Sequence, residues 1–110
     1  MAYSKYKNKK VTIDGIEFDS IKEGNRYAEL KLLEKVGIIK DLELQPKFEL
    51  IPKYKIGGRS VRKMEYVADF KYIENGKVVI EDVKGMKTEV YKIKKKLFEF
   101  QYGIEVREIY

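Results

Sequence analysis

The chain has 110 residues, of which 44% are hydrophobic, so its length and composition suit one ordinary domain with a real core. It contains no cysteine and no histidine, which excludes thiolate zinc sites, disulfides, cysteine nucleophiles, serine–histidine hydrolysis and histidine-ligated nucleases. The 24 Lys and Arg exceed the 18 Asp and Glu, and the net charge of +6 favours a polyanionic partner such as nucleic acid.

The beginning of the chain suggests an appended basic segment and no targeting signal. Residues 1–10 are polar and lysine-rich, and we expect a flexible basic arm there, with a frayed terminus as the alternative. No charged-then-apolar leader opens the chain, and no apolar run approaches the ~18 residues of a membrane-spanning helix. We therefore expect a cytoplasmic protein without membrane contact, with a single domain over residues 11–110.

The first part of this domain predicts a hairpin followed by a helix. Residues 11–13 and 16–18 form two short strands around the Asp-Gly turn signal at 14–15. Ser20 is suited to cap the helix, and Gly37 is suited to end it in the left-handed conformation. Two apolar stripes follow helical spacing, one formed by Ile21, Ala28, Leu32 and Val36, and the other by Tyr27, Leu30 and Leu33.

The rest of the chain predicts strands, a polar loop and one further helix. We expect extended segments over 38–51, 61–73, 77–84 and 104–110, a loop over 52–60 and a helix over 87–101. The strongest hairpin signal, Asn75-Gly76, joins the two middle strands. Val90, Ile93, Leu97 and Phe100 are expected on one apolar face of the second helix. This order predicts an α/β fold, a mixed β-sheet flanked by helices.

The hairpin register brings two acids together. If Asn75-Gly76 is a two-residue loop, counting outward from it places Asp69 opposite Asp82. Opposed residues share one face with Cβ atoms ~5 Å apart, and two like charges at that spacing are destabilising. A hard divalent cation is a natural compensation, and Lys84 lies two residues after Asp82 on the same face. The alternatives are ordinary charged strand ends, or a slip of register that separates the two aspartates.

Glu23 has two interpretations. Three residues after Ser20, it completes a capping-box pattern, which by itself explains a glutamate there. At 100° per residue it also lies in line with Tyr27 and Leu30, on a partly apolar face aimed at the sheet. A carboxylate on such a face is costly unless it is paired or bound to a metal.

These residues carry a resemblance to a known superfamily. Asp69, twelve intervening residues and then Asp82-Val83-Lys84 resemble the bipartite motif of the PD-(D/E)xK nucleases, although Ala68 stands where the name has proline. Glu23 resembles the additional acid of the Holliday-junction resolvase branch. Small phage-encoded endodeoxyribonucleases and resolvase-like proteins are similar over about residues 8–109, through four blocks: Phe18-Asp19-Ser20-Ile21-Lys22-Glu23, Leu44-Gln45-Pro46-Lys47-Phe48, Tyr66-Val67-Ala68-Asp69-Phe70 and Glu81-Asp82-Val83-Lys84-Gly85.

The resemblance implies an αβββαβ restriction-endonuclease-like core and metal-dependent hydrolysis of DNA phosphodiesters. Asp69 and Asp82 would bind Mg²⁺, with Mn²⁺ able to substitute, and the Val83 carbonyl and Glu23 would complete the site. Lys84 would either activate the attacking water or stabilise the transition state, and the sequence does not choose between these roles. A branched DNA substrate and a homodimer are implied if the substrate is a four-way junction, because two symmetric strands must be cut.

Further residues are candidates for DNA contacts. The lysines of the second helix, together with Gln45, form the candidate set: Lys87, Lys92, Lys95, Lys96 and Gln45. For each lysine the alternative is a solvated helix face. At the level of the whole protein, the alternatives to a resolvase are a general or nicking endonuclease, a non-catalytic nucleic-acid-binding module, and an interaction protein that keeps the fold.

Overall fold

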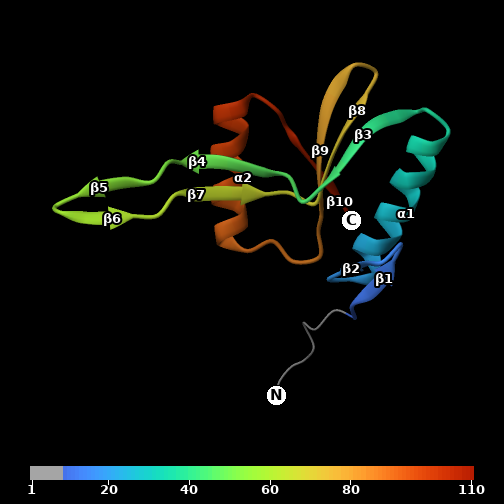
Figure 1. Cartoon of the computed structure of the whole chain (residues 1–110), viewed down its shortest axis with the longest axis horizontal. Coiled ribbons are helices and arrows are strands. Elements are labelled where there is room, and N and C mark those ends of the chain that lie inside the picture. Colours follow the sequence, from blue (N-terminus) through green and yellow to red (C-terminus); the bar gives the residue numbers. More distant parts are fainter. Residues whose placement is uncertain (1–8) are drawn as a thin grey trace.

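The structure, a computed structural model, describes residues 9–110 as a mixed α/β arrangement of two helices and ten strands (Figure 1). The predicted basic arm over 1–10 therefore lies outside the described residues, except for Lys9 and Lys10. In this described part, neither helix has the length and apolar character needed to cross a bilayer.

A four-stranded mixed sheet occupies the centre, in the order β10-β9-β8-β3. Its strands are β3 (Ile39–Leu44), β8 (Phe70–Glu74), β9 (Lys77–Val83) and β10 (Val106–Ile109). The β9–β10 pair is parallel and the β8–β9 and β3–β8 pairs are antiparallel. The crossover between the parallel strands is the helix α2, as expected for a parallel connection. The predicted mixed sheet with flanking helices is confirmed at this level.

The predicted hairpin register is confirmed. Glu74 pairs with Lys77 and Phe70 pairs with Glu81, so β8 and β9 are joined by a two-residue turn. Asn75 and Gly76 both have positive φ, 54° and 74°, as a type I′ turn requires. Beyond the last ladder pair, the Asp69 N–H still donates to the Glu81 carbonyl at 3.0 Å. The predicted register is therefore confirmed as far as Phe70 and Glu81, whereas Asp69 bonds to Glu81 and does not continue the ladder as the partner of Asp82.

The first helix, α1 (Ile21–Lys35), packs on one face of this sheet together with the hairpin of β1 (Val11–Ile13) and β2 (Ile16–Phe18). Ser20 caps it by accepting the Glu23 N–H at 3.1 Å, and Gly37 follows its end with φ of 86°. Of the two predicted stripes, the one with Tyr27 and Leu30 is buried, whereas Leu32 of the other stripe is 61% exposed. The core on this side also contains Phe70 and Tyr72 of β8.

The second helix, α2 (Glu89–Tyr102), begins at Thr88 and ends at Gly103, close to the predicted bounds. The apolar face predicted for it, with Val90, Ile93, Leu97 and Phe100, is not the face that packs on the rest of the protein, because all four are exposed and Phe100 reaches 89%. Phe98 is buried instead, with its ring centroid 4.7 Å from Phe48 and 5.2 Å from Tyr66. The aromatic rings of a separate ribbon thus select the face that α2 buries.

That ribbon replaces the single long strand and the loop that the sequence predicts. β4 (Lys47–Ile51) pairs with β7 (Met64–Val67), and β5 (Tyr54–Ile56) pairs with β6 (Arg59–Val61) beyond it. The segment predicted as one strand over 61–73 is therefore divided, with breaks at residues 62–63 and 68–69. The predicted loop over 52–60 contains a hairpin that turns at Gly57 and Gly58, both with positive φ. Figure 1 shows the two pairs of strands running away from the sheet as one long ribbon.

Candidate active site

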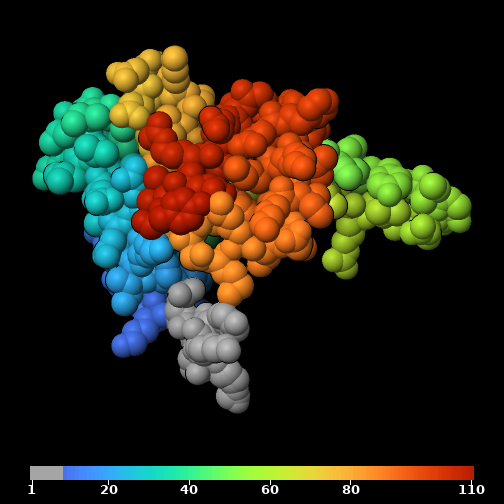
Figure 2. All heavy atoms as spheres, turned by 180° about the vertical axis from the view of Figure 1, so that it is seen from behind, coloured from blue at the N-terminus to red at the C-terminus, as the bar shows by residue number. Residues whose placement is uncertain are grey.

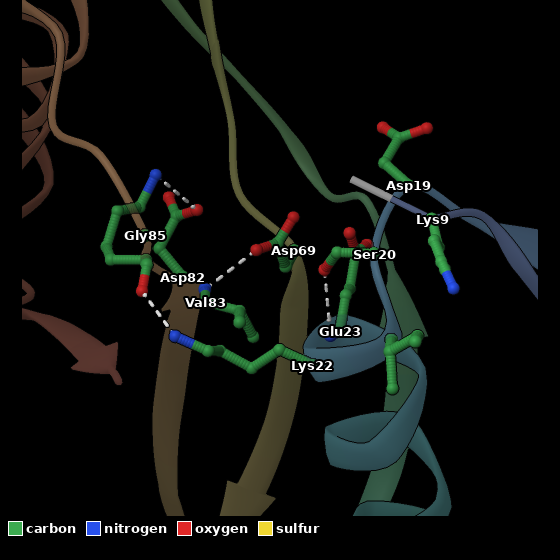
Figure 3. A pocket seen from close by; sticks show the side chains of 11 residues that line it. Lys9, Asp19, Ser20, Lys22, Glu23, Asp69, Asp82, Val83 and Gly85 are labelled. Atoms are coloured by element: carbon green, nitrogen blue, oxygen red, sulfur yellow. Dashed lines mark hydrogen bonds and ion pairs between the residues drawn. The ribbon is translucent and has the colours of Figure 1, made fainter. Parts of the chain in front are cut away.

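A cavity of about 390 Å³ opens where the first turn of α1 meets the ends of β8 and β9. All the predicted catalytic and metal-ligating residues line it: Glu23, Asp69, Asp82, Val83 and Lys84. Figure 3 shows Asp69 and Asp82 on neighbouring chain segments, with Ser20 and Glu23 at the start of the helix facing them. The structure therefore brings together residues that are separated by up to sixty positions in the chain.

The carboxyl group of Asp69 is subject to opposing influences on its pKa. Its carboxylate accepts the Val83 N–H at 2.7 Å, which favours the ionised form. Burial and the neighbouring charge of Asp82 act more strongly in the opposite direction and raise the pKa of Asp69 to about 7. Glu23 adds a smaller contribution of the same sign. The site thus concentrates negative charge that the protein compensates incompletely.

Asp82 is 4% exposed and is held on both carboxylate oxygens. The Lys84 ammonium lies 3.1 Å from Oδ1, and the Tyr66 hydroxyl donates to Oδ2. Lys84 is itself supported, because its Nζ lies 3.6 Å from the centre of the Tyr91 ring. The Tyr91 hydroxyl in turn donates to Glu108 Oε2 at 2.7 Å.

Sequence reasoning missed Tyr66 and Tyr91. Tyr66 lies in a quoted block, three residues before Asp69, but nothing in one sequence shows that its hydroxyl reaches Asp82. Tyr91 belongs to the opposite helix, and its contact with Lys84 depends on which face α2 buries. Both tyrosines have a raised pKa, first because of burial, so they act as hydrogen-bond donors at neutral pH.

Glu23 reaches the cavity and is only 9% exposed. Ser20 caps the helix as predicted, but among residues 9–110 no hydrogen bond runs back from Glu23 to the Ser20 backbone. Burial, then the charges of Asp19 and Asp82, raise the pKa of Glu23, while Lys84 lowers it. The side chain is therefore part of the acidic cluster, and the capping interaction involves only the backbone of Glu23.

The cluster fits a divalent cation in its chemistry but not in its present spacing. Within the described residues, no three acidic side chains are grouped as a metal site requires. The Lys84 ammonium supplies the positive charge next to Asp82, and cation binding at that oxygen would displace it. The donors are nevertheless carboxylate oxygens, which Mg²⁺ and Mn²⁺ prefer. The pKa of Asp69 is raised by burial first and by the charge of Asp82 second, and a bound cation would offset both effects.

The predicted DNA-contacting lysines lie outside this cavity and are largely engaged elsewhere. Lys87 lies 2.9 Å from Glu108, and Lys95 lies 3.8 Å from the same carboxylate. Lys92 pairs with Glu89 at 3.2 Å, whereas Lys96 is exposed. Gln45 lines a smaller neighbouring cavity with Glu23 and Asp69, so it is the one member of the set beside the acids.

Comparisons with known proteins identify one family. Neither a curated protein nor a solved structure matches the chain. A family model described as "Protein of unknown function (DUF1064)" matches residues 3–109. That match includes the acidic cluster, Lys84 and both helices, so the chain belongs to the DUF1064 family.

Proposed function

We propose that this protein is a metal-dependent DNA endonuclease of the PD-(D/E)xK kind, and specifically a structure-specific enzyme of the Holliday-junction resolvase type. The observation that carries the proposal is the convergence of Asp69, Asp82 and Lys84 in one cavity, with Glu23 entering from the helix. An acid on one strand, acid-x-Lys on the next and an acid on the first helix are the parts that such chemistry needs.

The topology supports the finer fold within this proposal. Leaving aside the hairpins, the order is α1, β3, β8, β9, α2 and β10, which corresponds to an αβββαβ restriction-endonuclease-like core. The sheet order β10-β9-β8-β3 places the two acid-bearing strands in the middle. The ribbon between β3 and β8 is an insertion into this core.

In the proposed reaction, Asp69 and Asp82 hold Mg²⁺ or Mn²⁺, and Glu23 and the Val83 carbonyl are further candidate ligands. The cation, when bound, neutralises charge on the phosphate and acidifies a water. Tyr66 orients the Asp82 carboxylate through its hydroxyl, and the Val83 N–H orients Asp69. Lys84, released from Asp82, either takes part in proton transfer from the attacking water or stabilises the charge on the phosphate. The water oxygen forms a new bond to phosphorus as the bond from phosphorus to the sugar oxygen breaks, and that oxygen leaves as a hydroxyl after taking a proton from solvent.

A homodimer remains part of this proposal, because cutting a four-way junction symmetrically needs two active sites. The exposed stripe of α2 is the surface that we propose for it. Its apolar residues follow 3-4-3 spacing, which is typical of helices that pack side by side: Val90, Ile93, Leu97 and Phe100. Sedimentation of the wild type and of Phe100→Lys checks this: we expect a dimer for the wild type and a monomer for the variant.

The decisive test is cleavage of a labelled four-way junction beside linear duplex and single strand of matched sequence, with Mg²⁺ and with EDTA. We expect Mg²⁺-dependent cutting that favours the junction and falls at least ~10³-fold in Asp82→Asn, because a ligand charge is lost. Lys35→Gln, on an exposed turn of α1, is the matched control and should cut normally.

Other outcomes of that assay distinguish the alternatives. Mg²⁺-dependent cutting of all substrates would indicate a general or nicking endonuclease with the same site. DNA binding that survives Asp82→Asn, with no cutting in any metal, would indicate a non-catalytic nucleic-acid-binding module. Absence of DNA binding at low salt would contradict the proposal altogether.

A further inference from the structure

The ribbon of β4–β7 and β5–β6 ends in an exposed basic hairpin, residues 53–63. From here on we call this hairpin the basic arm; it is a different segment from the basic N-terminal residues 1–10. It carries five cationic residues and no acidic one: Lys53, Lys55, Arg59, Arg62 and Lys63. All five are exposed, and the chain has no acid between Glu49 and Glu65. In residues 9–110 the only ion pair formed by these five is that of Lys63 with Glu65, at 3.2 Å.

The arm stands clear of the rest of the molecule. Figure 2 shows it in green, projecting beyond the body formed by α2 and the sheet. Its strands make contacts mainly with each other, and every residue from Ile51 to Ser60 is exposed. Such a ribbon cannot be explained by core formation, because Tyr54 and Ile56 are left 45% and 55% exposed. Four positive charges that form no ion pair within residues 9–110, beside a fifth paired with Glu65, point to a polyanionic partner.

The two faces of the arm differ. Lys55 pairs with Ser60, so these polar side chains share one face of the hairpin. On the other face, Tyr54 pairs with Val61, and Ile56 pairs with Arg59 near the tip. A two-stranded ribbon of this width fits the major groove of B-form DNA, where one polar and one partly apolar face can meet phosphates and base edges. The deep, narrow major groove of duplex RNA does not admit such an element.

The arm is also connected directly to the candidate active site. β7 leads from the arm to Ala68 and Asp69 within a few residues. The eleven residues from the Gly58 tip to Asp69 span at most roughly 36 Å in extended form, which is about one helical turn of DNA. A duplex held by the arm therefore reaches the acids within about ten base pairs of the arm contact.

From these observations we infer that the basic arm grips a duplex segment of the substrate about one turn away from the cleaved phosphate. This inference rests on the proposed function, since it concerns the same substrate. The basic arm also replaces the lysines in and just before α2 as the main predicted DNA contacts, because Lys87 and Lys95 already form ion pairs with Glu108.

The test measures binding without cleavage, by fluorescence anisotropy in EDTA at several salt concentrations, with a duplex of about 20 base pairs. The variant Lys55→Gln/Arg59→Gln/Arg62→Gln should bind at least ~10-fold more weakly and lower the slope of log K against log salt by about 3. The control Lys35→Gln/Lys40→Gln/Lys77→Gln removes the same charge from exposed residues outside the arm and should change the slope by less than about 1.

Equal losses in the two triple variants would overturn the inference, because net charge alone would then explain binding. Arm-dependent binding that favours duplex RNA or phosphatidylserine vesicles over duplex DNA would overturn it as well. A wild type that binds DNA through the arm yet cleaves no substrate with Mg²⁺ would refute the proposed nuclease and leave the arm inference standing. A wild type that cleaves DNA while both variants bind equally would refute the arm inference alone.

Discussion

The two helices differ in which of their side chains they bury and in the elements that cover those side chains. α1 buries Tyr27 and Leu30 beside a buried charge pair, in which Arg26 donates to Glu81 at 2.9 and 2.6 Å. α2 buries Phe98 among the aromatic rings of the ribbon and leaves its longer apolar stripe outside. Apolar content predicts a buried face only when the neighbouring element is known, because packing partners decide which stripe is covered.

The candidate site lies where the packing surface of α1 meets the packing surface of α2 and the ribbon, a boundary that we call the seam. Glu23 comes from α1, whereas Lys84 and Asp82 are supported by Tyr91 of α2 and Tyr66 of the ribbon. Glu81 and Asp82 are neighbours on β9 and point to opposite sides, one into the Arg26 pair and the other into the cluster. Both packing surfaces therefore have to form before the acids can meet, and the predictions below test each surface separately.

The largest expected stability effect is on the α2 side. Phe98→Ala should lower the free energy of unfolding by about 3–5 kcal/mol, because it leaves a cavity among packed rings. Phe100→Ala, only two residues away but 89% exposed, should change it by less than about 0.5 kcal/mol. Urea denaturation at low protein concentration measures both values. If the two variants lose similar stability, the assignment of the buried face of α2 is wrong.

On the α1 side, Arg26→Leu should lower the free energy of unfolding by about 3 kcal/mol, because it leaves the fully buried Glu81 carboxylate without its main partner. The loss should lie at the low end of the range for such pairs, since Tyr72 still donates to Glu81 and Arg107 lies 3.9 Å away. The control is Glu29→Gln, which breaks only an exposed pair of Arg26 and should be nearly neutral. Thermal denaturation distinguishes the two variants, and an equal loss in both would contradict a dominant buried pair.

The smallest expected effect is the pH dependence of the free energy of unfolding that comes from Asp69 in the candidate site. Because the folded state raises the pKa of Asp69 to about 7 from its ordinary value near 3.8, the folded protein keeps a proton that the unfolded chain releases. Stability of the metal-free protein should therefore fall as pH rises from about 4 to about 7, and the full cost should be present above that.

Asp69→Asn removes this cost while its amide oxygen can still accept the Val83 N–H. At pH 8 in EDTA we expect it to be more stable than the wild type by about 1–2 kcal/mol, whereas at pH 4 the two should be equal. Melting temperatures across this pH range provide the measurement. A variant that is less stable than the wild type at pH 8 would show that the folded state does not penalise the charge of Asp69.

Several features could be predicted because they depend on neighbouring residues. The Asn75-Gly76 turn sets the β8–β9 register as far as Phe70 and Glu81, and Asp69, Asp82 and Lys84 line one cavity at the end of this hairpin. Glu23 was placed on the buried side of its helix from helical geometry, since the period of 3.6 residues puts it in line with Tyr27. The ends of α1 followed from the capping residue Ser20 and from Gly37.

By itself, then, the sequence determined the two predicted hairpin turns, the approximate ends of the helices and the face of β9 that carries Asp82, with Lys84 just beyond the strand, because turn geometry and backbone periods act over a few residues. Only the tertiary structure decided which stripe α2 buries, how residues 52–67 extend into a ribbon, and that Tyr66 and Tyr91 support the acids. Those features depend on contacts between residues far apart in the chain, where several apolar surfaces compete for one core and packing selects among them.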